Sequence, residues 1–189
     1  MVTFLSVLAG AALPSVYVLY AGYRYGWDER AVGLSLALVG IFSVLVQAVF
    51  MKPIVARFGE RIALLAGLAS GAVGMIVYGV ASNGTIFTLG TPILMFWGLS
   101  SAAQSMMTRH VGPSEQGELQ GAVGSIRGIA SLAGPGIFAG TFATFVGALR
   151  TVNLPGAPWF LAALLLAGAV ALATNVTRAT RPAIMSARS

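Results

Sequence analysis

The sequence predicts an all-α integral membrane protein, built as a bundle of six membrane-spanning helices. Three observations predict this class: 57% of the 189 residues are hydrophobic, only 8% are charged, and the mean hydropathy is +0.87. Soluble domains contain about 25% charged residues, so this chain has too few to cover a water-exposed surface. The apolar residues form continuous runs rather than an alternating pattern, which excludes a transmembrane β-barrel.

Charges and turn residues divide the chain into segments of membrane-spanning length, since about 20 helical residues cross a bilayer core. The uncharged run 62–108 is twice that length, and we divide it at the turn cluster Ser82–Thr85. The chain enters the last span through Pro155 and Pro158. The spans are predicted at about residues 1–22, 31–51, 62–81, 86–108, 119–149 and 157–176, in one domain over 1–178 with a tail at 179–189.

The positions of the basic residues predict the orientation. With the amino terminus inside, seven basic residues lie on the inner side and three on the outer side, so both termini are expected in the cytoplasm of a plasma membrane, such as a bacterial inner membrane. The same bias explains a net charge of +6 without nucleic-acid binding. The inner set is Lys52, Arg57, Arg61, Arg109, Arg178, Arg181 and Arg188, and the outer set is Arg24, Arg30 and Arg150.

The segment after the second predicted span, Lys52–Arg61, carries the first family signal. Arg57, Gly59 and Arg61 match a short cytoplasmic loop motif of the major facilitator superfamily, whereas Ala56 stands where that motif has an acid. The resemblance implies that the two arginines hold the loop against neighbouring helix ends. On the residues alone, they could equally mark only the cytoplasmic side.

Further stretches extend this resemblance along the chain to about residue 178. In order and spacing they resemble the carboxyl-terminal half, helices seven to twelve, of the tetracycline-efflux branch of drug/proton antiporters. The resemblance implies alternating access, proton antiport and export of small amphipathic compounds. It also implies an acid in the third span, where this chain has Ser70. The stretches are Tyr25–Asp28, Val32–Ala37, Gln104–Arg109, Gln116–Gly121 and Gly134–Pro135.

Polar side chains inside the spans are the candidates for a substrate cavity. Gln47 and Gln104 lie in two different spans and must find partners across helices or in a water-filled cavity. Both match family positions. Tyr17 and Tyr20 could line the same cavity or belong to the outer aromatic belt. Ser70 completes this group.

Arg127 is the one charge within the fifth span, roughly 15 Å along the helix from Gly117. A charge near the bilayer centre costs about 2.5–3.5 kcal/mol on insertion scales, so it should face the interior or reach the interface. It could bind an anionic group of a substrate or pair with carbonyls of a neighbouring helix. The acidic residues all fall outside the predicted spans, so any proton coupling is expected mainly in another part of the transporter. They are Asp28, Glu29, Glu60, Glu115 and Glu118.

The fifth span is crowded with small residues, which let helices approach closely. Pro135 removes one backbone hydrogen bond, so we expect a bend at Gly134 and Pro135. A nucleotide-binding loop is excluded because no Lys-Ser/Thr pair follows these glycines. The glycines are Gly117, Gly121, Gly124, Gly128, Gly134, Gly136 and Gly140.

Enzyme chemistry is not indicated, because the sequence has no metal-ligand cluster, no serine nucleophile with a basic partner and no phosphate loop. We expect neither a metal nor a cofactor. As half of a transporter, the chain would pair with an amino-terminal six-helix half or with a second copy of itself. The alternatives are a non-transporting six-helix membrane subunit and an inactive truncated fragment. Asp28 is expected to cap the second span.

Overall fold

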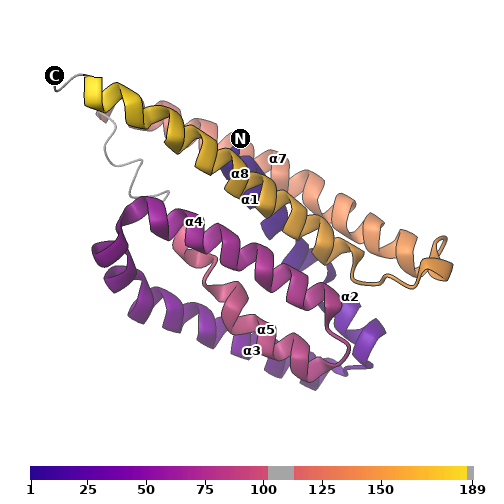
Figure 1. The fold of residues 1–189 in the computed structure, drawn as a ribbon. Coiled ribbons are helices and arrows are strands. Elements are labelled where there is room, and N and C mark those ends of the chain that lie inside the picture. Colours follow the sequence, from indigo (N-terminus) through magenta and orange to yellow (C-terminus); the bar gives the residue numbers. More distant parts are fainter. Residues whose placement is uncertain (102–112, 187–189) are drawn as a thin grey trace.

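The computed structural model describes residues 1–101 and 113–186, with the side chains of all of these except 113–116, 119 and 176–186. These residues form an elongated bundle of helices with no strand (Figure 1). The elements are α1 (Val2–Gly10), α2 (Ala12–Tyr25), α3 (Glu29–Leu45), the π-helical turn η1 (Val46–Phe50), α4 (Met51–Val80), α5 (Gly84–Met95), α7 (Pro113–Val146), the 3-10 turn η3 (Arg150–Val152) and α8 (Ala157–Ser186).

Four helical runs within the described residues are long and apolar enough to cross a membrane, which agrees with the predicted all-α membrane class. The run Glu29–Val80 contains the predicted span 31–51 and all but the last residue of the predicted span 62–81. The predicted span 86–108 lies only partly inside the described residues, so six spans remain a prediction. The other three runs are Val2–Tyr25, Gln120–Val146 and Ala157–Asn175.

Side-chain caps fix two of the helix starts. The Asp28 carboxylate accepts a hydrogen bond from the Ala31 amide at 2.8 Å, which confirms the predicted cap of α3. Asn83 accepts one from the Ile86 amide at 2.9 Å and begins α5 in the same way. The turn predicted at Ser82–Thr85 is therefore confirmed at Ser82 and Asn83, whereas Gly84 and Thr85 already belong to α5.

The prediction of a loop over residues 52–61 was wrong for most of that segment. α3 continues through η1 into α4, and Lys52–Phe58 is helical. The interruption is confined to Gly59, whose backbone has φ 80° and ψ 163°, a region that only glycine adopts without strain. Charged residues therefore mark the end of the apolar span but do not end the helix. α8 likewise runs to Ser186, past the predicted end at residue 176.

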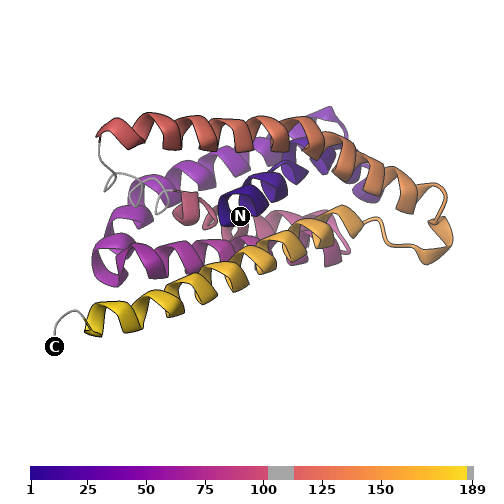
Figure 2. The ribbon, with the colours of Figure 1, turned by 90° about the horizontal axis from the view of Figure 1, so that it is seen from above.

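The bundle is held together mainly by α4, which packs along both α8 and α5. α1 packs against α8 and α7, and α3 contacts α5 at the side (Figures 1 and 2). We call the end with the connections 26–28, 81–83 and 147–156 the aromatic end. The opposite end, where Lys52 and Arg57 lie at the start of α4, is the basic end.

Candidate functional site

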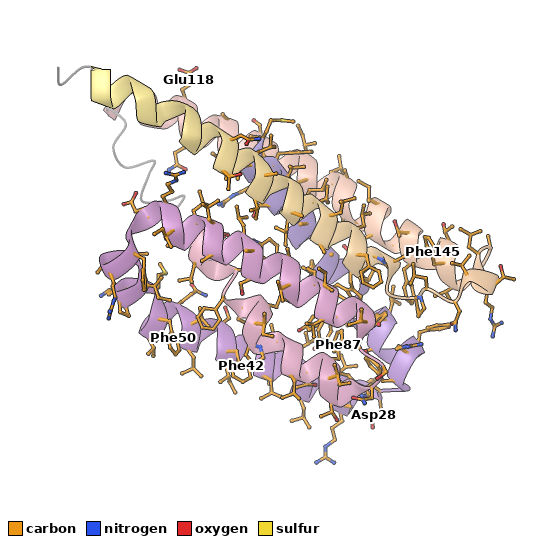
Figure 3. The ribbon with its side chains drawn as sticks, in the orientation of Figure 1. Asp28, Phe42, Phe50, Phe87, Glu118 and Phe145 are labelled. Atoms are coloured by element: carbon orange, nitrogen blue, oxygen red, sulfur yellow. The ribbon has the colours of Figure 1, made fainter. Side chains whose placement is uncertain are left out.

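Large aromatic side chains from five helices form one cluster at the aromatic end. The Tyr78 ring stacks on the Phe87 ring with centroids 4.0 Å apart, and the Trp159 ring meets the Tyr78 ring edge-on at 5.3 Å. Figure 3 shows Phe87 at the end of the bundle that also carries Asp28. The cluster joins α2, α4, α5, α7 and α8. Its members are Tyr17, Tyr20, Tyr25, Trp27, Tyr78, Phe87, Phe142 and Trp159.

Tyr17 and Tyr20 belong to this cluster and are buried, with 2% and 0% of their surfaces exposed. The Tyr20 hydroxyl donates a hydrogen bond to the Tyr78 carbonyl oxygen at 3.2 Å. The Tyr17 hydroxyl lies near Ser35 without a hydrogen bond among the described residues. Within this chain both rings pack against other rings, and a role of either one toward a substrate stays a prediction.

Gln47 lies on the π-helical turn η1 and its side chain is exposed. Its amide nitrogen donates hydrogen bonds to the Ser43 hydroxyl at 2.9 Å and to the Ser43 carbonyl oxygen at 3.3 Å. The Phe50 ring, one helical turn further, meets the Phe96 ring at 5.5 Å (Figure 3 labels Phe50). Short π-helical turns occur frequently at functional sites. Among the described residues, the amide oxygen of Gln47 makes no hydrogen bond, so it could accept one from a bound molecule.

Ser70 connects two helices. Its hydroxyl donates a hydrogen bond to the Ile93 carbonyl oxygen of α5. That carbonyl lies in the last turn of α5, where Trp97 bonds to Leu94 instead of continuing the α-helical pattern. The hydroxyl therefore satisfies a helix-end acceptor, which would otherwise be costly in an apolar environment.

Arg127 is exposed on α7, seven residues after the start of the apolar run Gln120–Val146. This spacing places it about 10 Å along the helix from that start. Gln104, the other strongly polar candidate, lies outside the described residues, as do Arg109 and His110. The structure thus does not bring Gln47, Gln104 and Arg127 together as one described site.

The basic motif lies at the start of α4. Arg57 is exposed and its guanidinium lies 5.8 Å from the centroid of the Phe58 ring. Arg61 is also exposed, and it has an interaction partner. Gly59 between them is the helix interruption described above, so the glycine of the motif is required by its backbone conformation.

The small residues of α7 behave differently from one another. Gly134 packs against Ala11, at the break between α1 and α2, so closely that a side chain would collide with the Ala11 methyl group. α7 remains helical through Pro135 and bends along its length (Figure 2). Around the other glycines of α7 up to position 140, a Cβ atom would meet nothing within 4 Å among the described residues. These are Gly117, Gly121, Gly124, Gly128, Gly136 and Gly140.

α4 carries several closely packed glycines, which the sequence analysis missed. A Cβ atom on Gly71 would lie 2.8 Å from the Trp97 ring, and one on Gly74 would lie 2.7 Å from the Leu94 backbone. Gly67 meets the Ser100 backbone in the same way. Small residues at spacings of four and three were visible in the sequence as the signal for this contact.

These features define a polytopic α-helical membrane protein whose candidate ligand-facing groups are single polar side chains. Among the described residues, no three acidic, histidine or cysteine side chains are grouped to hold a metal. The model of the Major Facilitator Superfamily matches residues 1–188. The chain therefore belongs to that family, which consists of membrane transporters and not of enzymes.

Several curated relatives are tetracycline resistance proteins. The chain is 33% identical to the class C protein of Escherichia coli over 165 residues, which cover 87% of the chain and 40% of the relative. It is 32% identical to the class G protein of Vibrio anguillarum over 87% of the chain and 41% of the relative. Hippocampus abundant transcript-like protein 1 of Mus musculus is 29% identical over 75% of the chain and 28% of its own length. The chain thus spans less than half the length of these relatives.

Proposed function

We propose that this chain is the carboxyl-terminal half of a drug efflux transporter that exports small amphipathic compounds, tetracycline-like drugs among them, by alternating access with proton antiport. The observation that carries the proposal is the 33% identity to the class C tetracycline resistance protein over 87% of the chain. The apolar helical bundle supports it. The basic end would face the cytoplasm, because Lys52, Arg57 and Arg61 gather there.

An amino-terminal six-helix half would complete the transporter by covering the exposed sides of α3 and α7. Leu34 and Val44 of α3 and Leu132 of α7 are 62%, 65% and 86% exposed. Transporters of this kind move one helical unit against another around a central site. The alternative is that a second copy of this chain covers these exposed sides of α3 and α7.

Within the complete transporter, Gln47, Gln104 and Arg127 are the residues we propose to face the substrate. The exposed Gln47 amide next to Phe50 and Phe96 suits a ring that carries a hydrogen-bond donor. Arg127 would contact an anionic group. The proton-coupling group would lie mainly in the other half, since the five acidic residues of this chain all fall outside its predicted spans.

The test uses inside-out vesicles from cells that make the chain alone, an amino-terminal half of the class C tetracycline resistance protein alone, or both. We expect tetracycline uptake that an uncoupler abolishes, and only when both halves are present. Arg127→Ala should lower this uptake. Ser125→Ala is the matched control, because among the described residues the Ser125 hydroxyl bonds to the Gly121 carbonyl oxygen of its own helix and to no other group.

Other outcomes separate the alternatives. Uptake by the chain alone, with a light-scattering mass near twice 19.4 kDa, would favour the second copy. A stable complex that binds tetracycline without uptake would favour a non-transporting subunit. A chain that neither associates nor binds would contradict the proposal.

A further inference from the structure

Three helices of this bundle are interrupted or bent near a proline. α1 and α2 separate at Ala11, because Pro14 cannot donate a hydrogen bond to the Gly10 carbonyl oxygen. α5 ends at Met95, three residues after Pro92, and the chain turns at 96–97 before it is helical again. α7 contains Pro135 directly after Gly134.

Trp97 joins the interruption of α5 to that of α1 and α2. Its ring nitrogen donates a hydrogen bond to the Ser6 hydroxyl oxygen at 3.3 Å. A Cβ atom on Gly10 would lie 3.2 Å from the far edge of the indole, and one on Gly71 would lie 2.8 Å from its near edge. The indole therefore fills a slot that glycines of α1 and α4 leave open.

The α7 bend rests on the same place. Gly134 lies against the Ala11 methyl group, and Ala11 is the residue next to Gly10. The Ser15 hydroxyl donates to the Ala11 carbonyl oxygen at 2.5 Å, and the Ala11 amide bonds to the Leu8 carbonyl oxygen at 3.0 Å. The break at Ala11 thus contacts both other interruptions, through Gly134 on one side and through the neighbouring Gly10 on the other.

The two ends of the bundle differ on either side of this junction. At the aromatic end, the Tyr20 and Tyr25 hydroxyls donate to carbonyl oxygens at the end of α4, and the Tyr78 hydroxyl bonds to Thr91 at 2.8 Å. α7 itself is held at this end by the Phe142 ring, whose centroid lies 6.4 Å from that of Tyr20. Toward the basic end, α7 makes no ring contact and no hydrogen bond to another helix among the described residues. Arg127 is exposed there, and a Cβ atom on any of three neighbouring glycines would meet no atom of another helix within 4 Å among the described residues. The three are Gly121, Gly124 and Gly128.

We propose that Ala11, Trp97 and Gly134 form one hinge, about which the part of α7 toward the basic end moves while the aromatic end stays fixed. Trp97 acts as a positioning residue: its indole keeps the breaks of α1 and α5 in register, so that both bend together. Packed interfaces shift between discrete arrangements rather than deforming continuously. A junction of three helix interruptions permits such a shift. Use of the hinge in alternating access rests on the proposed transport function, but the hinge motion itself does not.

The experiment measures distances between pairs of spin labels in the full chain in lipid nanodiscs. The sequence contains no cysteine, so each pair can be introduced without background labelling. One pair, at Ser125 and Ile62, reports α7 against α4 toward the basic end, and a second, at Thr144 and Val80, reports the aromatic end. All four side chains are exposed. We expect a wider distance distribution for the first pair than for the second.

Trp97→Ala should shift and widen the distribution of the basic-end pair and leave the aromatic-end pair unchanged. Trp159→Ala is the matched control, because this buried indole belongs to the aromatic cluster, and the variant should change the aromatic-end pair instead. Ser6→Ala removes only the hydrogen bond, and Trp97→Phe removes that bond together with part of the ring that fills the slot at Gly10. Both should produce the same shift to a smaller extent than Trp97→Ala.

Three results would overturn the hinge. The first is a distance distribution of the basic-end pair that, in the unaltered chain, is as narrow as the distribution of the aromatic-end pair. The second is a Trp97→Ala variant that changes both pairs equally, because this would indicate general loosening. The third result applies if Trp97→Ala does not fold. In that case the hinge is overturned if Trp97→Phe and Ser6→Ala both leave the distance distribution of the basic-end pair unchanged. No substrate is needed, so a failed transport assay and a failed hinge are distinguishable.

Discussion

Two helices of the bundle, α4 and α7, are both long, apolar and rich in glycine, yet apart from Gly59 and Gly134 the glycines discussed on them have opposite surroundings. On α4, Gly71 and Gly74 lie against the Trp97 ring and the Leu94 backbone. On α7, Gly124 and Gly128 meet nothing within 4 Å among the described residues. The same residue type therefore serves packing inside the chain on one helix and leaves an open surface on the other.

Hydrogen bonds strengthen the difference. α4 is tied to α5 by Ser70 and by Tyr78, and it receives a hydrogen bond from Tyr20 of α2. The hydroxyls of α7, such as Ser125 and Thr144, bond to carbonyl oxygens of their own helix. Side chains that satisfy themselves locally leave a helix free to be covered by something else. This is why we place the partner of the chain against α7 and not against α4.

The largest effect is expected for Gly74→Ala. The added methyl group would lie 2.7 Å from the Leu94 Cα atom, and a helix backbone cannot move away without repacking α5. We expect a loss of about 3 kcal/mol in the free energy of unfolding, at the upper end of typical overpacking costs. Denaturation by detergent titration, followed by circular dichroism, measures it. An unchanged midpoint would show that α4 and α5 are not in close contact.

Gly59→Ala should have the next largest effect, although it too adds only a methyl group. The cost arises from the backbone, because φ 80° with ψ 163° is unfavourable for any residue with a Cβ atom, and no neighbouring atom lies within 4 Å. We expect a loss of about 2 kcal/mol, or a straightened helix. The same titration measures the loss. Ala56→Gly, at an exposed helical position of the same segment, is the control and should cost less than about 1 kcal/mol.

Tyr78→Phe removes one hydrogen bond between α4 and α5 and keeps the ring that stacks on Phe87. The variant leaves the Thr91 hydroxyl buried without this partner, so we expect a loss of about 1 kcal/mol. Thr91→Val should cost a similar amount. The double variant should cost less than the sum of the two, and a double-mutant cycle gives the coupling. Strict additivity would show that the two hydroxyls do not interact.

The sequence predicts the membrane class, the helix cap at Asp28 and the turn that begins at Ser82, because these depend on nearby residues. Asp28 and Asn83 cap helices through amides three residues away, which local spacing reveals. The role of Ser70 could not be predicted, since its acceptor, Ile93, lies 23 residues away on another helix. The choice between the glycine stripes of α4 and α7 likewise depends on what lies across from each helix, which composition and spacing do not contain.

The smallest effect on stability, and the most informative one for α7, is expected for Gly124→Ala. Its Cβ position is free of contacts within the described residues, so the methyl group should stabilise the isolated chain by about 0.5–1 kcal/mol through higher helix propensity. The same methyl group should weaken association with an amino-terminal half, because close helix approach depends on small residues. Detergent titration of the single chain and co-purification of the two halves measure these opposite effects. If stability rises and co-purification is unaffected, the partner does not approach α7 at Gly124. If stability falls, another part of this chain already covers that side of α7.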